Sequence, residues 1–231
     1  MNISDLHDAG LALRLQRKLD AKTKPPGSLG RLEQLALQIG LVLGTETPQL
    51  QQPQLVVCAG DHGLAARGVS AYPGDVTWQM VENFLAGGAA VSVLARQHGL
   101  ALTVVDCGVV HDFAPREAPA ALAPRLLRRK VARGTADSSQ GPAMTAAQCE
   151  IAIANGRTLV RALPGNAVLL GEMGIANTSA ASLLLARLGG QALADCVGAG
   201  TGLDAVGVAR KAAVLHQVLA LHAAAVTPLQ A

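Results

Sequence analysis

Aromatic residues are scarce in this chain: one Trp, one Tyr and two Phe make up 2% of its 231 residues. The core must therefore be filled by Leu, Val, Ile and Ala, and a chain of this length buries a large core in one or two domains. Charge of one sign is also lacking, because the net charge is only +3. The basic cluster RLLRRKVAR at 125–133 has no interleaved aromatic side chains that could stack on bases. We therefore favour a solvated basic face over nucleic-acid binding.

Cysteine is rare, and its four residues lie far apart without a CxxC or Cys/His pair: Cys58, Cys107, Cys149 and Cys196. This pattern is typical of reduced thiols in the cytosol. No uninterrupted apolar run approaches the roughly 20 residues that span a bilayer, and the amino terminus has no basic leader before an apolar block. We expect a soluble cytoplasmic protein without a signal peptide or membrane association.

Cofactor motifs are absent as well. Neither G-x-G-x-x-G after the first predicted strand nor GxxxxGK[ST] occurs, which disfavours NAD and ATP chemistry. Asp61 and His62 are adjacent but have no further ligands at suitable spacing for a metal. We expect neither a cofactor nor a metal.

The pattern that is present alternates strands with helices. Short apolar runs closed by glycine predict buried strands at 54–60, 102–110, 166–174 and 193–202. Helical spacing predicts two helices within the first 45 residues, the first with one apolar face: Leu11, Leu15 and Leu19. Further helices are expected from residues 75, 145, 178 and 204, the second of these with a capping box at Thr145 and Gln148. This order predicts an α/β fold whose parallel sheet has helices on both faces.

Glycine and a polar residue follow each predicted strand, in GDHG at 60, DCG at 106, GEMG at 171 and GAGTG at 198. Ligands bind at the carboxyl ends of parallel strands, so we expect these four loops to form one pocket. The last two are favoured as an anion site, with Asn177, Thr178 and Ser179 as caps or donors and Lys211 reaching back from the next helix. The alternative is that glycine only permits close packing and that Lys211 is a surface lysine.

Glu172 stands where the third predicted strand meets the loop GEMGIANTS at 171–179, called the phosphate loop below. A carboxylate there can stabilise positive charge on a sugar ring or transfer a proton; a charge at a helix start, or a partner for a lysine, is the alternative. His62 is either a proton carrier or a loop histidine bonded to backbone. Trp78 and Phe84 either form a wall for a planar ligand or are ordinary core residues. Ser70 and Tyr72, in the loop before them, are the better candidates for such a wall.

Six ordered motifs resemble one family: KPPGSLGRLE, AGDHG, GVSAYPGDVTWQMVENFLAGGAAVSVLAR, GTADSSQGPAMT, GEMGIANTSAAS and GAGTGLDAVGVARKAAV. They occur in this order in nicotinate-nucleotide:dimethylbenzimidazole phosphoribosyltransferases, which attach the lower base in the nucleotide loop of cobalamin. The resemblance implies a homodimer with a Rossmann-like α/β domain, here 51–231, and a small helical domain to which 1–50 contributes.

By this resemblance, the 5-phosphoribosyl group moves from nicotinate mononucleotide to 5,6-dimethylbenzimidazole, giving α-ribazole 5′-phosphate and nicotinate without a metal or cofactor. Glu172 would be the catalytic residue beside the ribose. The implied phosphate and ribose contacts are Gly174, Ile175, Asn177, Thr178, Gly200, Gly202 and Lys211. The implied base contacts are Ser70, Tyr72, Gln79 and Met173.

The chain departs from the family pattern at three places. Ala176 replaces a usual glycine beside the phosphate loop and can narrow it, and Asp137 replaces a usual amide with a negative charge. Family members also continue beyond LHAAAVTPLQA through a segment that carries the glutamate regarded as the general base. A chain ending here would leave the small domain incomplete, expose apolar surface and lose about 10²–10⁴-fold in rate. An impaired ligand-binding protein and a nonfunctional fragment are therefore the alternatives to an active transferase.

Overall fold

The computed structural model describes residues 7–115 and 123–231. The chain divides into two compact units, Met1–Gln51 and Gln52–Ala231. Within the described residues, no helix is long and apolar enough to cross a membrane.

The first unit consists of two helices, α1 (Ala9–Asp20) and α2 (Arg31–Leu43), which confirms both predicted helices. The predicted apolar face of α1 is buried: Leu11, Leu15 and Leu19. Leu15 packs on Gly40 of α2 so closely that a Cβ there would lie 2.6 Å from a Leu15 methyl group. The two helices therefore meet at a glycine, and the apolar side chain of Leu32 on another face of α2 stays 63% exposed.

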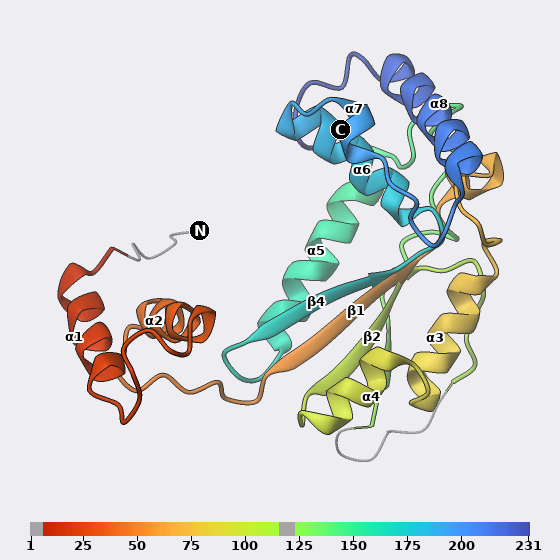
Figure 1. The fold of residues 1–231 in the computed structure, drawn as a ribbon. Coiled ribbons are helices and arrows are strands. Elements are labelled where there is room, and N and C mark those ends of the chain that lie inside the picture. Colours follow the sequence, from red (N-terminus) through yellow and green to blue (C-terminus); the bar gives the residue numbers. More distant parts are fainter. Residues whose placement is uncertain (1–6, 116–122) are drawn as a thin grey trace. The chain divides into compact units, whose positions relative to one another are not determined.

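A four-stranded parallel sheet in the order β3-β2-β1-β4 forms the centre of the second unit (Figure 1). Its strands are β1 (Gln54–Gly60), β2 (Ala101–Gly108), β3 (Arg125–Arg128) and β4 (Val168–Met173). Its helices are η1 (Gly63–Arg67), α3 (Val76–Ala86), α4 (Ala90–Gln97), α5 (Ala146–Ala162), α6 (Asn177–Gly189), α7 (Leu193–Cys196) and α8 (Ala205–Leu221). Three predicted strands and the parallel α/β fold are thus confirmed.

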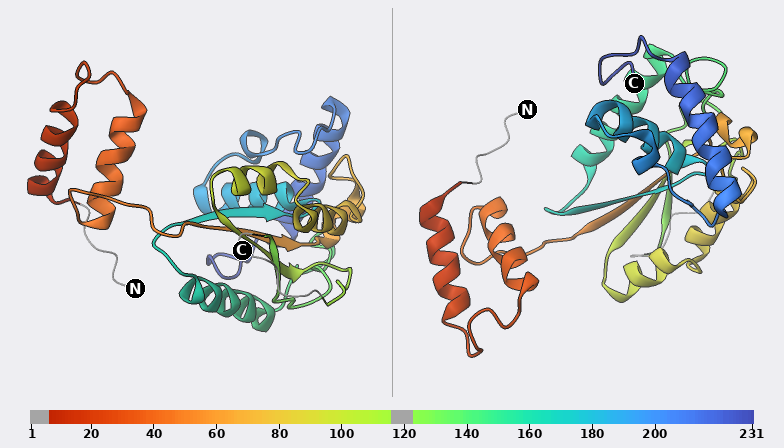
Figure 2. Two further views of the ribbon diagram at one scale, coloured as in Figure 1. Left: turned by 90° about the horizontal axis from the view of Figure 1, so that it is seen from below. Right: turned by 45° about the horizontal axis from the view of Figure 1, so that its top comes forward.

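Alternate residues of β1 face opposite sides of the sheet, as the two-residue period of a strand requires. Val57 belongs to a core with α3 and α4, whereas its neighbour Val56 packs with Leu159 of α5. Figure 2 shows α5 on the opposite face of the sheet from α3 and α4. A further apolar cluster joins α6, α7 and α8, with Leu215 fully buried. The predicted helical cover on both faces is confirmed.

The capping box predicted at the start of α5 is also confirmed. Thr145 Oγ1 accepts a hydrogen bond from Gln148 N at 3.2 Å, and Gln148 Oε1 accepts one from Thr145 N at 2.8 Å. Two donors that the first turn would otherwise leave unpaired are therefore satisfied.

The prediction of a strand at 193–202 is wrong. This segment forms the short helix α7 and then a loop in which Gly200 and Gly202 have φ of 56° and 111°. Positive φ values are incompatible with a strand, and Val197 is the segment's only β-branched side chain before them.

The remaining strand of the sheet, β3, lies instead within the basic cluster at 125–133. β3 pairs with β2 at the edge of the sheet, and Arg125 Nε donates to Thr103 Oγ1 of β2 at 2.7 Å. Charged residues are common on edge strands because the outer backbone groups face solvent. The helix predicted from residue 75 is likewise divided into α3 and α4, since Gly87 has a φ of 81° and ends α3.

Candidate functional site

The candidate site lies at the carboxyl ends of β1 and β4, which are neighbours in the sheet. Glu172, the penultimate residue of β4, stands opposite Cys58 in the register. The Glu172 side chain is exposed, but partial burial of its carboxyl raises the pKa, and the neighbouring Asn177 amide partly opposes this. Among the described residues no lysine forms an ion pair with Glu172, in contrast to the lysine partner considered as an alternative.

The turn between β4 and α6 requires a glycine at position 174. A Cβ on Gly174 would lie 2.4 Å from the Gly60 carbonyl oxygen and 3.1 Å from the His62 ring. This close approach joins the end of β1 to the end of β4. Both segments therefore contribute to the same small volume.

Two backbone amides of the implied phosphate loop already have partners. Ile175 N donates to Thr77 Oγ1 of α3 at 3.1 Å, and Asn177 N donates to Gly174 O at 3.0 Å. Thr178 lies in the first turn of α6, where a helix leaves amides without intrahelical acceptors. Within this turn, Asn177 N and Ser179 N are bonded to the carbonyls of Gly174 and Ala176, so the Thr178 amide suits an anion better than those of Ile175 and Asn177.

Ala176, the residue that departs from the family pattern, has a φ of 75° and is the N-cap of α6. Left-handed backbone costs a residue with a Cβ about 1–2 kcal/mol relative to glycine. Its side chain is 5% exposed and belongs to the apolar cluster of α6, α7 and α8. The extra methyl group is therefore packed in the core rather than directed at a ligand.

The structure brings the loop 198–202 against the start of α6. Lys211 Nζ donates to Thr178 Oγ1 at 2.9 Å and to Gly198 O at 3.3 Å. A Cβ on Gly200 would lie 3.1 Å from Thr178 Oγ1 and 3.6 Å from Lys211 Nζ. The two loops that we predicted to act together do lie together.

Lys211 is 1% exposed, so the alternative of a solvated surface lysine is wrong. Both of its hydrogen-bond partners are neutral oxygens, and it forms no ion pair with a described carboxylate. Burial lowers the pKa of its ammonium group. A buried cation without a counter-ion is costly unless an anion completes its surroundings.

The loop with the implied base contacts is held beside loop 198–202. Ser70 Oγ lies 3.2 Å from Thr201 Oγ1, and Arg210 Nε of α8 donates to Gly68 O at 3.1 Å. Tyr72 in this loop is 53% exposed. Ser70 and Tyr72 are therefore placed near the loop that carries Gly200 and Gly202.

The other two implied base contacts have different surroundings. Gln79 is exposed on α3, and Met173 packs on the core between the sheet and α3. Trp78 stacks on His111 with ring centroids 4.8 Å apart, and Phe84 is 6% exposed within the same core. The interpretation as an ordinary core residue is confirmed for Phe84, whereas Trp78 is only partly buried at the edge of that core.

The loops after β1 and β2 differ from expectation in one respect. Asp106 is 2% exposed and accepts hydrogen bonds from Gly108 N and Val109 N, so it stabilises its own turn and does not face a ligand. The predicted pocket of four loops therefore loses this carboxylate. His62, by contrast, lies against the turn before α6, with its ring 3.1 Å from where a Cβ of Gly174 would be, and burial lowers the pKa of its imidazole.

Asp137, the second departure from the family pattern, is not a free negative charge. Arg67 Nε lies 2.6 Å from its Oδ2. Although burial acts to raise its pKa, hydrogen bonds from Ser139 and from Arg67 outweigh this and hold the pKa below its usual value. Sequence reasoning missed Arg67, Thr77 and Thr201 as supporting residues, because nothing local marks a contact made across the fold.

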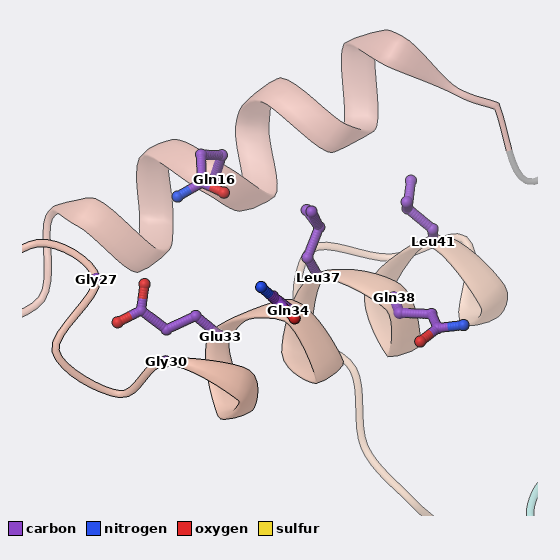
Figure 3. A pocket seen from close by; sticks show the side chains of 8 residues that line it. All are labelled: Gln16, Gly27, Gly30, Glu33, Gln34, Leu37, Gln38 and Leu41. Atoms are coloured by element: carbon purple, nitrogen blue, oxygen red, sulfur yellow. The ribbon is translucent and has the colours of Figure 1, made fainter.

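A separate cavity of about 360 Å³ lies in the first unit, between the two helices and the turn that joins them (Figure 3). Its lining residues are Gln16, Gly27, Gly30, Glu33, Gln34, Leu37, Gln38 and Leu41. Lys24 Nζ lies 2.8 Å from Glu33 Oε1, and this ion pair lowers the pKa of the Glu33 carboxyl. The cavity contains none of the predicted site residues.

Comparison with known proteins agrees with the motifs. The family model DBI_PRT, described as Phosphoribosyltransferase, matches residues 5–231. The chain belongs to this phosphoribosyltransferase family. The resemblance inferred from the six motifs is thereby confirmed.

Among curated members of the family, a protein of Variovorax paradoxus (strain S110) is 71% identical over 230 residues, covering 100% of this chain and 64% of the relative. One of Dechloromonas aromatica (strain RCB) is 58% identical over 215 residues, covering 92% and 60%. Both are named nicotinate-nucleotide–dimethylbenzimidazole phosphoribosyltransferase. The crystal structure of CobT from Thermus thermophilus is 41% identical with a TM-score of 0.77, covering 92% of this chain and 62% of that one. The chain thus spans somewhat less than two thirds of these family members.

Proposed function

We propose that this protein transfers the 5-phosphoribosyl group of nicotinate mononucleotide to 5,6-dimethylbenzimidazole, a step of cobalamin biosynthesis. The names of the relatives and the shared family support this assignment. In this reaction, the bond between ribose C1 and the pyridinium nitrogen breaks and nicotinate leaves with the electron pair. One benzimidazole nitrogen bonds to C1, and the other nitrogen loses its proton.

The buried ammonium of Lys211 is the observation that carries the proposal. It lies between Thr178 and Gly198 without a carboxylate partner among the described residues. A phosphate monoester placed between the start of α6 and loop 198–202 would supply the missing negative charge, and the Thr178 amide in the first turn of α6 would donate to it.

The remaining roles follow from the positions of the side chains around that anion. Glu172 stands at the start of the phosphate loop, so its carboxylate can face a ribose whose 5′-phosphate is held there. As the pyridinium leaves, positive charge grows on the ribose ring, and a carboxylate at that point stabilises it. We assign the base slot to Ser70, Tyr72, Gln79 and Met173, and the phosphate contacts to Gly174, Ile175, Asn177, Thr178, Gly200, Gly202 and Lys211.

We also propose that the protein works as a cytoplasmic homodimer. All four cysteines are free, as is typical of a reducing compartment. Light scattering during size-exclusion chromatography will measure the mass in solution against the 23.5 kDa of one chain. A single peak at the mass of one chain, at micromolar concentration, would contradict the homodimer.

Incubation with nicotinate mononucleotide and 5,6-dimethylbenzimidazole tests the activity, with nicotinate release followed by chromatography and binding by calorimetry. Glu172→Gln should lower turnover by about 10²-fold or more while binding persists, because one group that stabilises developing charge is typically worth that much. Glu150→Gln, which changes an exposed glutamate on α5, is the matched control and should leave turnover unchanged.

The outcomes separate the three hypotheses. Turnover that depends on Glu172 supports the transferase. Binding of both ligands without turnover supports a ligand-binding protein, and a failure to bind either ligand leaves only a fragment that keeps the fold.

A further inference from the structure

One buried hydrogen bond joins the phosphate loop to α3, although the two residues that form it are 98 positions apart. Ile175 N, in the turn between β4 and α6, donates to Thr77 Oγ1 at 3.1 Å. Thr77 is fully buried, and Ile175 is 3% exposed. A hydrogen bond in such surroundings does not compete with water, so it holds its two segments together more firmly than a surface contact does.

The amide of Ile175 is bonded across the fold rather than within its own turn. In the same turn, Asn177 N donates locally to Gly174 O at 3.0 Å. Ile175 N instead donates to a hydroxyl of the helix that follows β1 and η1 in the chain. Nearly all buried amides in proteins are paired, because an unpaired one loses its bond to water without a replacement. We therefore expect the conformation of this turn to depend on the acceptor that Thr77 supplies.

Thr77 is also connected to the base slot. It is the second residue of α3, and its own amide donates to Gly74 O at 2.9 Å. Gln79 stands two residues further along α3, while Ser70 and Tyr72 lie in the loop that leads into this helix. Threonine is branched at Cβ and has few rotamers in a helix, so its Oγ1 moves with the helix backbone. A shift of the start of α3 would therefore displace the turn of the phosphate loop as well.

We propose that Thr77 is a positioning residue that couples the anion site to the base slot. Its side chain is fully buried and so touches neither ligand. Its hydroxyl makes the turn before α6 and the start of α3 move together. The ligand that binds first then holds both segments in place, and the second ligand binds a site that is already arranged. The identity of the two ligands rests on the function proposed above.

Calorimetry with two ligands that cannot react measures this coupling. Ribose 5-phosphate occupies the anion site but carries no base that could leave, and 5,6-dimethylbenzimidazole occupies the base slot. In the unsubstituted protein, saturating ribose 5-phosphate should lower the Kd of the benzimidazole about tenfold, within the usual range of coupling between sites. In Thr77→Val, which keeps the shape of the side chain but has no acceptor, the Kd values with and without ribose 5-phosphate should agree within about twofold. Thr77→Ser keeps the hydroxyl and should restore the tenfold difference.

Thr103→Val distinguishes coupling from a simple loss of stability. Thr103 is 1% exposed, and its Oγ1 accepts a hydrogen bond from Arg125 Nε at 2.7 Å. It belongs to β2, which β1 separates from β4. This variant removes an equally buried acceptor and should keep the tenfold coupling. If it loses the coupling as Thr77→Val does, general destabilisation explains the result and the proposal fails.

The hydrogen bond itself is tested without any ligand. Hydrogen exchange followed by NMR should show a protected Ile175 amide in the unsubstituted protein and in Thr77→Ser. In Thr77→Val this amide should exchange at least about tenfold faster than in Thr103→Val. Equal exchange in these two variants overturns the proposal, and so does an unsubstituted protein without coupling. Tighter binding of ribose 5-phosphate to Thr77→Val would also overturn it, because Ile175 N would then donate to the phosphate and not to Thr77.

Turnover separates this proposal from the proposed function. If the protein is a transferase, Thr77→Val should raise the KM for 5,6-dimethylbenzimidazole about tenfold at saturating nicotinate mononucleotide and should change kcat less. If the coupling behaves as expected but no variant turns over, the proposed function fails and the positioning role stands. If turnover occurs and the coupling is the same in Thr77→Val and in the unsubstituted protein, the positioning role fails and the function stands. If neither ligand binds, both fail.

Discussion

Replacement of the buried lysine tests the phosphate site most directly. In Lys211→Met, the side chain keeps a similar length and loses its charge and its donors. A hydrogen bond to a charged partner contributes about 1.5–3 kcal/mol, which corresponds to about a 10- to 150-fold increase in the Kd for a phosphate ester. We therefore expect calorimetry with ribose 5-phosphate to show at least a tenfold weaker Kd in this variant.

The stability of the free protein should change much less than its affinity. Lys211→Met removes two hydrogen bonds to neutral oxygens, at 2.9 and 3.3 Å, which contribute about 1 kcal/mol each. It also removes a charge that burial destabilises, as the lowered pKa of the ammonium group indicates. These opposing effects leave the free energy of unfolding within about 2 kcal/mol of its original value. Thermal unfolding without ligand will measure this difference.

Two comparisons make this test specific. Ribose without phosphate should bind the two proteins equally weakly, and Arg157→Met, which removes an exposed cation on α5, should bind ribose 5-phosphate as the unsubstituted protein does. The reasoning is refuted if Lys211→Met binds ribose 5-phosphate within twofold of the unsubstituted protein. It is also refuted if Arg157→Met loses as much affinity, because net charge alone would then explain the result.

Four further predictions follow from individual residues. Ala176→Gly should change the free energy of unfolding by less than about 1 kcal/mol, because the relief of the left-handed backbone offsets two losses: the buried methyl group and the higher entropy of the unfolded chain. Urea unfolding will measure this. As a control, Ala186→Gly removes a similarly buried methyl group within helix α6 and should cost about 1.5–2 kcal/mol. Partial burial raises the pKa of Glu172 in the folded chain. Between the unfolded and the folded pKa the folded chain binds more protons, so stability falls as pH rises through this window. Glu172→Gln should therefore stabilise the protein above the window but not below it, which thermal unfolding at several pH values will measure. Arg187 donates to three backbone carbonyls at the end of α8, and Arg187→Met should cost about 1–3 kcal/mol in the same urea assay. Burial lowers the pKa of Lys211, and a bound phosphate would raise it again. Binding of ribose 5-phosphate at alkaline pH should therefore take up protons, which calorimetry in buffers of different ionisation enthalpy will detect. Lys211→Met should take up fewer protons on binding.

The sequence predicted those parts of the fold that local patterns determine. The runs at 54–60 and 102–110 are β-branched and closed by glycine, and both are strands. The capping box at Thr145 involves residues three apart, so the sequence contains all of it. The run at 193–202 was misleading because its apolar residues resemble a strand, whereas its glycines adopt positive φ. β3 escaped prediction because its terminal arginines resemble a solvated cluster.

The candidate site was predictable only in part, for a similar reason. Glycine and polar residues at strand ends indicated the right end of the sheet, and parallel strands bring those ends together. The burial of Lys211 and the partners of Asp137 depend on contacts between distant segments. The same is true of the approach of the His62 ring to Gly174. Residue spacing contains no signal for such contacts.

The close approach of Gly174 to Gly60 connects Glu172, His62 and the anion site. A Cβ on Gly174 would lie 2.4 Å from Gly60 O, so any other residue there must push the end of β4 away from the end of β1. Such a displacement would also disturb the His62 ring, which packs on the same glycine. α6 starts directly after this turn, so Thr178 would move with it and Lys211 would lose one of its two acceptors. The glycine of GEMG therefore positions the carboxylate and the anion site together.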